Sequence, residues 1–123
     1  MTIEEIFKKV LDCSFTVHTA LGPGLLESAY EECLYYELIQ AGLKVEKQKP
    51  LPLIYKEIKL DAGYRVDLLV ESSVIIELKS VESLCDIHMS IILTYLKLSG
   101  CKLGLLVNFN VQHLKDGIKR VIL

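Results

Sequence analysis

Apolar residues recur every three or four positions through the first 21 residues, which is the spacing of one face of an α-helix. The repeating positions are Ile3, Ile6, Phe7, Val10, Val17 and Leu21. Thr2 stands directly before them, where a hydroxyl side chain can cap the helix. The stretch LGPG at 21–24 ends this pattern, and a second helix is predicted from about residue 25 to residue 41, ended by Gly42.

The middle of the chain changes from helical spacing to an alternation of apolar and polar residues. The segment 43–56 alternates but contains Pro50 and Pro52. Because proline cannot donate a hydrogen bond to a sheet, this segment is predicted to be an edge strand or irregular extended chain. Two strands follow, at 57–71 and 74–80.

The last third of the chain adds a helix at about 87–98, ended by Gly100, and a wholly apolar strand at 103–109 of the buried type. A turn at Asp116–Gly117 leads to a short final strand. We find no linker or internal repeat. The order α-α-β-β-β-α-β-β therefore predicts one α/β domain over residues 1–123, with a central sheet flanked by helices.

The two strands at 57–71 and 74–80 form a predicted hairpin with an unusual polar face. If the hairpin turns at Ser72, Asp67 faces Glu77 and Arg65 faces Lys79, all on one side of the sheet. That side also carries Leu69 and Ile75 near the turn. The opposite side is entirely apolar, with Val66, Leu68, Val70, Val74, Ile76 and Leu78.

Two carboxylates that face each other across a hairpin repel, and a divalent metal ion between them would remove that repulsion. Lys79, two residues after Glu77 on the same face, could then hold a phosphate or a polarised water. The alternative is a solvated outer face on which glutamate and lysine pair. The apolar flanking strands favour the metal site, since a central strand of an α/β sheet has both faces covered.

Composition limits the possible surroundings of the protein. The chain has 123 residues, and none of its apolar runs nears the roughly 20 residues of a membrane span. Its start alternates acidic, apolar and basic residues, so we expect a soluble cytoplasmic protein without a secretion signal. The net charge of −2 argues against non-specific adhesion to nucleic acid. The four cysteines form no CxxC pair and are predicted to be buried free thiols, and the three histidines form no metal-ligand cluster.

Several motifs occur together in one order. They are GLLESAY at 24–30, GYRVDLLVE followed by IELKS, and then TYLKLSG, LGLLVNFN and LKDGIKR. The chain resembles the GxxExxY proteins of the PD-(D/E)XK nuclease superfamily from about Ile3 to Val121. The resemblance implies a restriction-endonuclease-like fold with a central mixed sheet, and Mg²⁺- or Mn²⁺-dependent cleavage of nucleic acid.

The resemblance also assigns roles to individual residues. It implies that Asp67 and Glu77 are the metal-binding acids, that Lys79 is the motif lysine, and that Glu27 is the helix-borne acid that joins them. From spacing alone, Glu27, Tyr30 and Glu31 share one helical face, so Glu27 can point at a sheet. The alternative is a surface glutamate in a helix with many acids. We expect Tyr30 to be a packing residue with a polar tip.

One position departs from the motif of related nucleases, which often carry QxxxY on the helix after ExK. Here HMSIILTY places Ile91 at the glutamine position and keeps Tyr95. His88, one turn earlier, either substitutes as a polar contact or is an ordinary surface histidine. The candidate substrate-binding residues are Tyr95, His88 and Arg65.

Two functions remain open from the sequence. The first is a nuclease that hydrolyses DNA phosphodiester bonds, either non-specifically or by substrate structure, because no sequence-reading element is visible. The second is a catalytically weak or inactive accessory module that keeps the fold and binds nucleic acid. A protein partner could supply specificity, and a homodimer is not excluded. The basic stretches 44–49 and 115–120 could follow a phosphate backbone or be ordinary surface.

Overall fold

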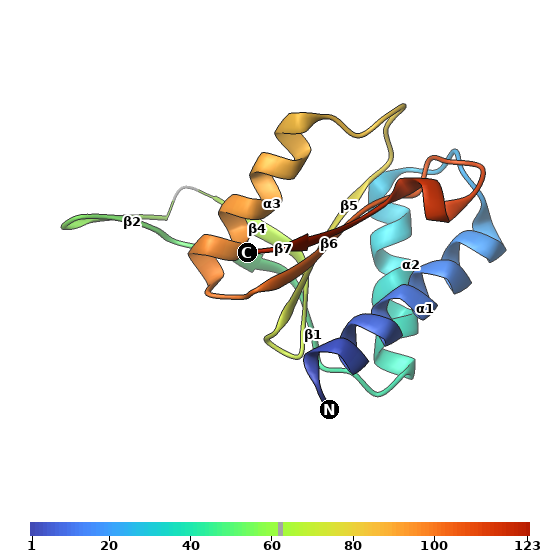
Figure 1. Cartoon of the computed structure of the whole chain (residues 1–123), viewed down its shortest axis with the longest axis horizontal. Coiled ribbons are helices and arrows are strands. Elements are labelled where there is room, and N and C mark those ends of the chain that lie inside the picture. Colours follow the sequence, from blue (N-terminus) through green and yellow to red (C-terminus); the bar gives the residue numbers. More distant parts are fainter. Residues whose placement is uncertain (62) are drawn as a thin grey trace.

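A computed structural model describes residues 1–61 and 63–123 of the chain. Its centre is a five-stranded mixed sheet with helices on both faces (Figure 1). The elements in chain order are α1 (Ile3–Leu21), α2 (Glu27–Gln40), β1 (Val45–Pro50), β2 (Leu53–Tyr55), β3 (Ile58–Leu60), β4 (Arg65–Val70), β5 (Val74–Lys79), α3 (Asp86–Ser99), β6 (Leu103–Asn108), the 3-10 helix η1 (Leu114–Gly117) and β7 (Ile118–Ile122).

The strands of the main sheet lie in the order β1-β4-β5-β6-β7. Among the described residues only β5 and β6 are parallel neighbours, and α3 is the crossover helix that connects them. The other neighbours are antiparallel. This topology confirms the predicted α/β class and the order of the main elements. The predicted helices also begin and end within two residues of the observed ones, and Thr2 caps α1 in a capping box with Glu5.

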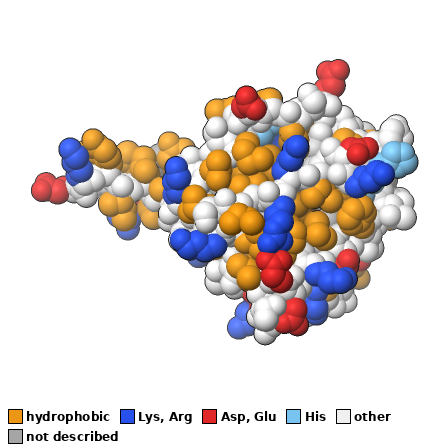
Figure 2. All heavy atoms as spheres, in the orientation of Figure 1, with side chains coloured by type: hydrophobic (Ala, Val, Ile, Leu, Met, Phe, Trp, Pro, Cys, Tyr) orange, Lys and Arg blue, Asp and Glu red, His pale blue; other side chains and the backbone are white. Residues whose placement is uncertain are grey.

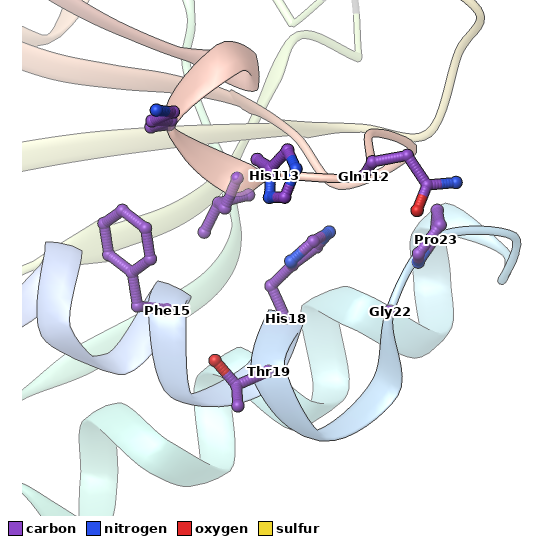
Figure 3. A pocket seen from close by; sticks show the side chains of 9 residues that line it. Phe15, His18, Thr19, Gly22, Pro23, Gln112 and His113 are labelled. Atoms are coloured by element: carbon purple, nitrogen blue, oxygen red, sulfur yellow. The ribbon is translucent and has the colours of Figure 1, made fainter.

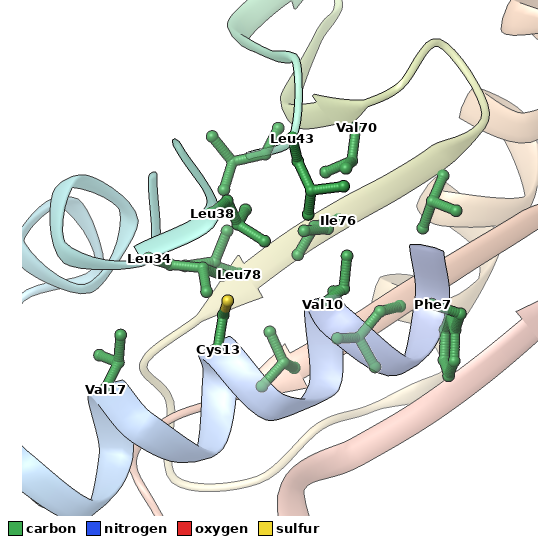
Figure 4. Packing of buried hydrophobic residues seen from close by; sticks show 14 of the residues in the cluster. Phe7, Val10, Cys13, Val17, Leu34, Leu38, Leu43, Val70, Ile76 and Leu78 are labelled. Carbon is green, nitrogen blue, oxygen red and sulfur yellow. The ribbon is translucent and has the colours of Figure 1, made fainter. Parts of the chain in front are cut away.

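Two apolar clusters hold the layers together, one on each face of the sheet. On one face α1 and α2 pack against alternate residues of β4, β5 and β6 (Figure 4). On the other face α3 contributes Ile92 and Leu96, which meet Leu69, Ile75 and Leu106. Strands β5 and β6 are therefore buried from both sides, as their continuous apolar runs predict.

The prediction of a single strand over 57–71 is wrong. The chain instead forms a separate two-stranded ribbon of β2 and β3, and β4 begins only at Arg65. Gly63, with a φ of +84°, lies in the intervening loop, and Pro50 and Pro52 end the ladder on the other strand. This arm projects from the body and exposes apolar side chains, including Ile54, Tyr55 and Ile58 (Figures 1 and 2).

Two other predictions can be compared with the fold. Cys13 and Cys101 are buried free thiols as expected, but Cys33 is half-buried and Cys85 is exposed, because it lies just before α3 and outside both clusters. Across the described ranges, none of the helices is both long and apolar enough to span a lipid bilayer.

Candidate active site

Strands β4 and β5 separate where their two acidic residues lie. The predicted register is confirmed near the turn, where Leu68 pairs with Ile76 and Val70 with Val74. The ladder ends there. Beyond it, the Glu77 carboxylate accepts from the Asp67 backbone amide at 3.0 Å, and the Asp67 carboxylate accepts from the Leu78 amide at 2.9 Å. At the open end of the hairpin, each carboxylate thus accepts a backbone N–H hydrogen bond that a carbonyl would accept in a continuous ladder.

The separation of the strands changes two details of the predicted hairpin. Arg65 and Lys79 do not pair, since the ladder ends before it reaches them. Val66, predicted on the same apolar face as Leu68, packs with Leu51 in the cluster on the α3 side instead. The remaining five residues of that face lie in the cluster under α1 and α2, as predicted. Both deviations occur where β4 has left β5.

Glu77 is the most strongly perturbed group of this region. Its side chain is buried, with only 6% of the residue exposed. Burial raises the pKa of Glu77 to about 9, and the adjacent Asp67 carboxylate adds to the increase through its charge and a hydrogen bond. Lys79 opposes the shift only weakly. The pair therefore binds a proton at neutral pH in the absence of another cation.

Gln48 and Glu31 join Asp67 from neighbouring elements. Gln48 of β1 donates through Nε2 to Asp67 Oδ1 at 3.2 Å and to Glu31 Oε1 at 2.9 Å. Burial, and then the charge of Asp67, raises the pKa of Glu31. The sequence interpretation missed the role of both residues. Glu31 shares a helical face with Glu27, which was a usable signal, whereas nothing in the alternation of β1 distinguishes Gln48.

The loop before α2 is held so that Glu27 starts the helix beside these acids. The Tyr30 hydroxyl donates to the Gly22 carbonyl and accepts from the Leu25 amide at 3.1 Å. Ser80, directly after β5, donates to the Leu25 carbonyl at 2.7 Å. The Tyr30 ring is fully buried and stacks on Phe109 with centroids 4.7 Å apart, which confirms its packing role.

Glu27 and Lys79 complete the acidic region. Partial desolvation raises the pKa of Glu27; the positive charge of Lys79 lowers it and the negative charge of Asp67 raises it. Glu27 and Asp67 also line the same groove, so these two carboxylates lie near each other. Lys79 is half-buried, and among the described residues its ammonium group forms no ion pair within 4.0 Å.

The candidate substrate-binding residues lie at different distances from the acids. The negative charges of Glu77 and Asp67, after burial, raise the pKa of Tyr95, so this hydroxyl is near the site. His88 lies near Glu27, but its Nδ1 accepts from the Cys85 amide at 3.1 Å and so helps to begin α3. Arg65 is exposed at the start of β4.

Ile91 lines a separate hollow together with Tyr95, and none of the lining residues is acidic. This hollow, of about 250 Å³, is lined by Tyr64, Ile87, Ser90, Ile91, Thr94 and Tyr95. Its walls are aromatic and aliphatic with two small hydroxyls. Position 91 therefore brings no amide toward Asp67 or Glu77.

Three of the six basic residues in the two basic stretches, 44–49 and 115–120, form ion pairs among the described residues. Lys47 pairs with Glu32 and Lys49 with Glu46, both at 2.8 Å. Arg120 pairs with Glu4 on α1. These contacts favour the interpretation of ordinary surface over that of a continuous track for a phosphate backbone.

Three of the acids, Glu27, Glu31 and Asp67, border an open groove of about 390 Å³, whose other lining residues are Leu26, Ser28 and Gln48. Glu77 and Lys79 are not among its lining residues. Within the part of the chain that the structure describes, no three His, Cys, Asp or Glu side chains converge tightly enough to hold a metal ion by themselves. Mg²⁺ and Mn²⁺ need only one or two carboxylates, however, when water and phosphate complete the shell. Asp67 and Glu77 supply carboxylate oxygens, which such an ion prefers as ligands. Its positive charge would also balance the buried Glu77 carboxylate, which otherwise retains a proton.

A larger hollow of about 630 Å³ lies elsewhere, between the end of α1 and the loop before η1 (Figure 3). His18 faces it and donates through Nε2 to the Val111 carbonyl at 2.7 Å. None of its lining residues is acidic. This hollow therefore offers no carboxylate to a metal ion.

One comparison with known proteins found a match. One family model matches residues 4–121, and its description is the PD-(D/E)XK nuclease superfamily. The match extends from α1 to β7. Searches of curated proteins and of solved structures gave no match.

Proposed function

This chain belongs to the PD-(D/E)XK nuclease superfamily, and we propose that it is a metal-dependent nuclease that hydrolyses phosphodiester bonds in DNA. The observation that carries the proposal is the pair of opposed carboxylates, Asp67 and Glu77, at the point where β4 and β5 separate. Lys79 follows Glu77 on the same strand, and Glu27, the first residue of α2, lines the same groove as Asp67. Together these residues follow the D…ExK order.

Asp67 and Glu77 would hold the divalent ion, Mg²⁺ or Mn²⁺, with Glu27 as a third acid. A bound ion of this kind supplies a Lewis acid and an activated water. The residues of the chain then have separate tasks. The Lys79 ammonium orients the attacking water or stabilises the added negative charge on the phosphate. Backbone hydrogen bonds from Leu78 and Asp67 hold the two carboxylates in place.

The form of substrate recognition follows from the shape of the site. The groove is open and is lined by residues of α2, β1 and β4, and the sequence shows no recognisable element for reading base edges. We therefore propose recognition of the phosphate backbone or of substrate structure, or specificity supplied by a protein partner. Tyr95 and His88 are the proposed substrate contacts, together with Arg65 at the start of β4.

An accessory module that binds without cleaving is the second candidate. It is favoured by one observation, Ile91, since α3 brings no amide to the acids. The two candidates differ in what they predict for metal binding and turnover.

Calorimetry with Mg²⁺ and Mn²⁺ tests the metal site. We expect wild type to bind Mn²⁺ and Asp67→Ala to lose that binding, because one of two principal ligands is gone. Asp116→Ala, which removes an exposed acid in η1, is the matched control and should bind as wild type does. Equal binding by Asp67→Ala and wild type would contradict the assignment.

Cleavage of single-stranded, duplex and flapped DNA and of RNA tests the activity. We expect Lys79→Ala to lower the rate about 100-fold or more, as for removal of one electrostatic contact to a transition state. Lys102→Ala removes an exposed lysine away from the acids and should cleave normally. Activity that survives in Lys79→Ala would indicate a contaminant, while metal binding without any cleavage would favour the accessory module.

A further inference from the structure

Gln48 interrupts β1 directly opposite Asp67. The β1–β4 ladder pairs Lys47 with Leu68 and then Lys49 with Val66, and so omits the pair between them. Gln48 has a φ of +50°, in the left-handed region that residues other than glycine rarely adopt. Since the β4–β5 ladder also ends before Asp67, this acid has no ladder partner on either side.

A strained residue of this kind persists only when its surroundings compensate for it. Here the compensating hydrogen bonds come from the side-chain amide of Gln48. One amide nitrogen donates to Asp67 on β4 and to Glu31 on α2. The positive φ that takes Gln48 out of the ladder thus places its side-chain amide between Asp67 and Glu31.

These contacts fix Asp67 from two directions. Oδ1 accepts from Gln48, and Oδ2 accepts from the Leu78 amide. An amide is suited to this position because its N–H groups bind both carboxylates without charge. A lysine would compete with a bound cation, and a glutamate would add a third negative charge.

We propose that Gln48 is a positioning residue that orients Asp67 and Glu31, an inference that rests on the proposed nuclease site. The side-chain amide that reaches Asp67 comes from β1. Residues that orient metal ligands typically contribute 10- to 100-fold to metal affinity.

Gln48→Gly separates this role from a purely structural one. Glycine adopts a positive φ without strain, so the melting temperature of the metal-free protein should be unchanged or higher. The affinity for Mn²⁺, measured by calorimetry, should nevertheless fall at least about 10-fold. Gln48→Asn, which tolerates the same backbone and keeps an amide on a shorter side chain, should recover part of that loss.

Ser72→Gly is the matched control, since Ser72 also has a positive φ, of +51°, in the β4–β5 turn. It should leave Mn²⁺ binding unchanged while relieving the same backbone strain. Gln48→Gly that binds Mn²⁺ within twofold of wild type would overturn the proposal. Absence of Mn²⁺ binding in wild type would instead contradict the nuclease assignment.

A measurement without metal distinguishes failure of the Gln48 proposal from failure of the nuclease assignment. The Gln48 side-chain amide signal in a nitrogen-15 NMR spectrum can be assigned by its loss in Gln48→Gly. It should shift in both Glu31→Gln and Asp67→Asn. An amide signal that responds to neither variant would overturn the positioning role whether or not wild type binds metal.

Discussion

At the scale of single residues, Glu77 shows how the fold tolerates an unfavourable group. A carboxylate buried beside a second carboxylate is destabilised by desolvation and by repulsion. The chain limits that cost through a hydrogen bond from the Asp67 backbone and through the proton that the raised pKa retains. A bound divalent cation would replace that proton, so stability and metal binding are linked at this residue.

The pKa of Glu77 predicts how stability depends on pH in the metal-free protein. The folded-state value of about 9 exceeds the ordinary value of 4.5, so the folded state holds the extra proton between them. The free energy of unfolding should therefore be highest below about pH 4.5, as far as this group is concerned, and should fall as pH rises toward 9. The expected loss is on the order of a few kcal/mol.

Urea denaturation at pH 5, 6, 7 and 8 in the presence of a chelator measures this dependence. Glu77→Gln imitates the protonated acid, and its stability should vary much less with pH. Glu82→Gln, which alters an exposed acid, should keep the wild-type slope. An identical slope in Glu77→Gln and wild type would mean that another group is responsible.

At the scale of elements, the spacing of Gly24, Glu27 and Tyr30 has a structural explanation. Gly24 has a φ of +102°, which lets the chain turn into α2. Tyr30, nearly one helical turn after Glu27, reaches back to hold Gly22 and Leu25. The motif therefore fixes where α2 begins, and with it the position of Glu27 at the groove.

Tyr30→Phe tests the contribution of the hydroxyl alone. The stacking on Phe109 should persist, but two hydrogen bonds are lost and buried backbone groups are left without this partner. We expect a loss of about 1–3 kcal/mol in the free energy of unfolding and weaker Mn²⁺ binding. Tyr36→Phe on the same helix, where the residue is 59% exposed, should change stability by less than about 0.5 kcal/mol. Equal effects of the two variants would contradict this explanation.

At the scale of the whole molecule, we expect the stability of the core to be independent of the arm formed by β2 and β3. The two apolar clusters involve α1, α2, α3 and the main sheet, whereas β2 and β3 pair only with each other in the described residues. A two-stranded ribbon contributes little stability in water. The core should therefore be insensitive to changes in the arm.

A pair of identical substitutions measures this separation. Ile76→Ala removes a fully buried side chain under α1 and α2 and should cost about 2–5 kcal/mol. Ile58→Ala removes one that is 54% exposed and should cost less than about 0.5 kcal/mol. Both values come from urea denaturation. A large loss for Ile58→Ala would mean that the arm packs on the body.

Local patterns account for much of what was predicted correctly. Periodicity located the three α-helices, and the alternation around Ser72 gave the register of β4 and β5. That register also brought Asp67 next to Glu77. These features depend on neighbours a few residues apart, for which side-chain direction follows directly from helix or strand geometry.

Contacts between distant segments decided the rest. The separation of β4 from β5 moved Val66 to the other cluster, and the break at Gln48 brought an amide to Asp67 and Glu31. The arm formed because prolines and Gly63 prevented a continuous ladder. The sequence alone determined which side chains could form the acidic site. Only the tertiary structure decided which ladder hydrogen bonds are absent around that site, because these hydrogen bonds depend on pairing between strands.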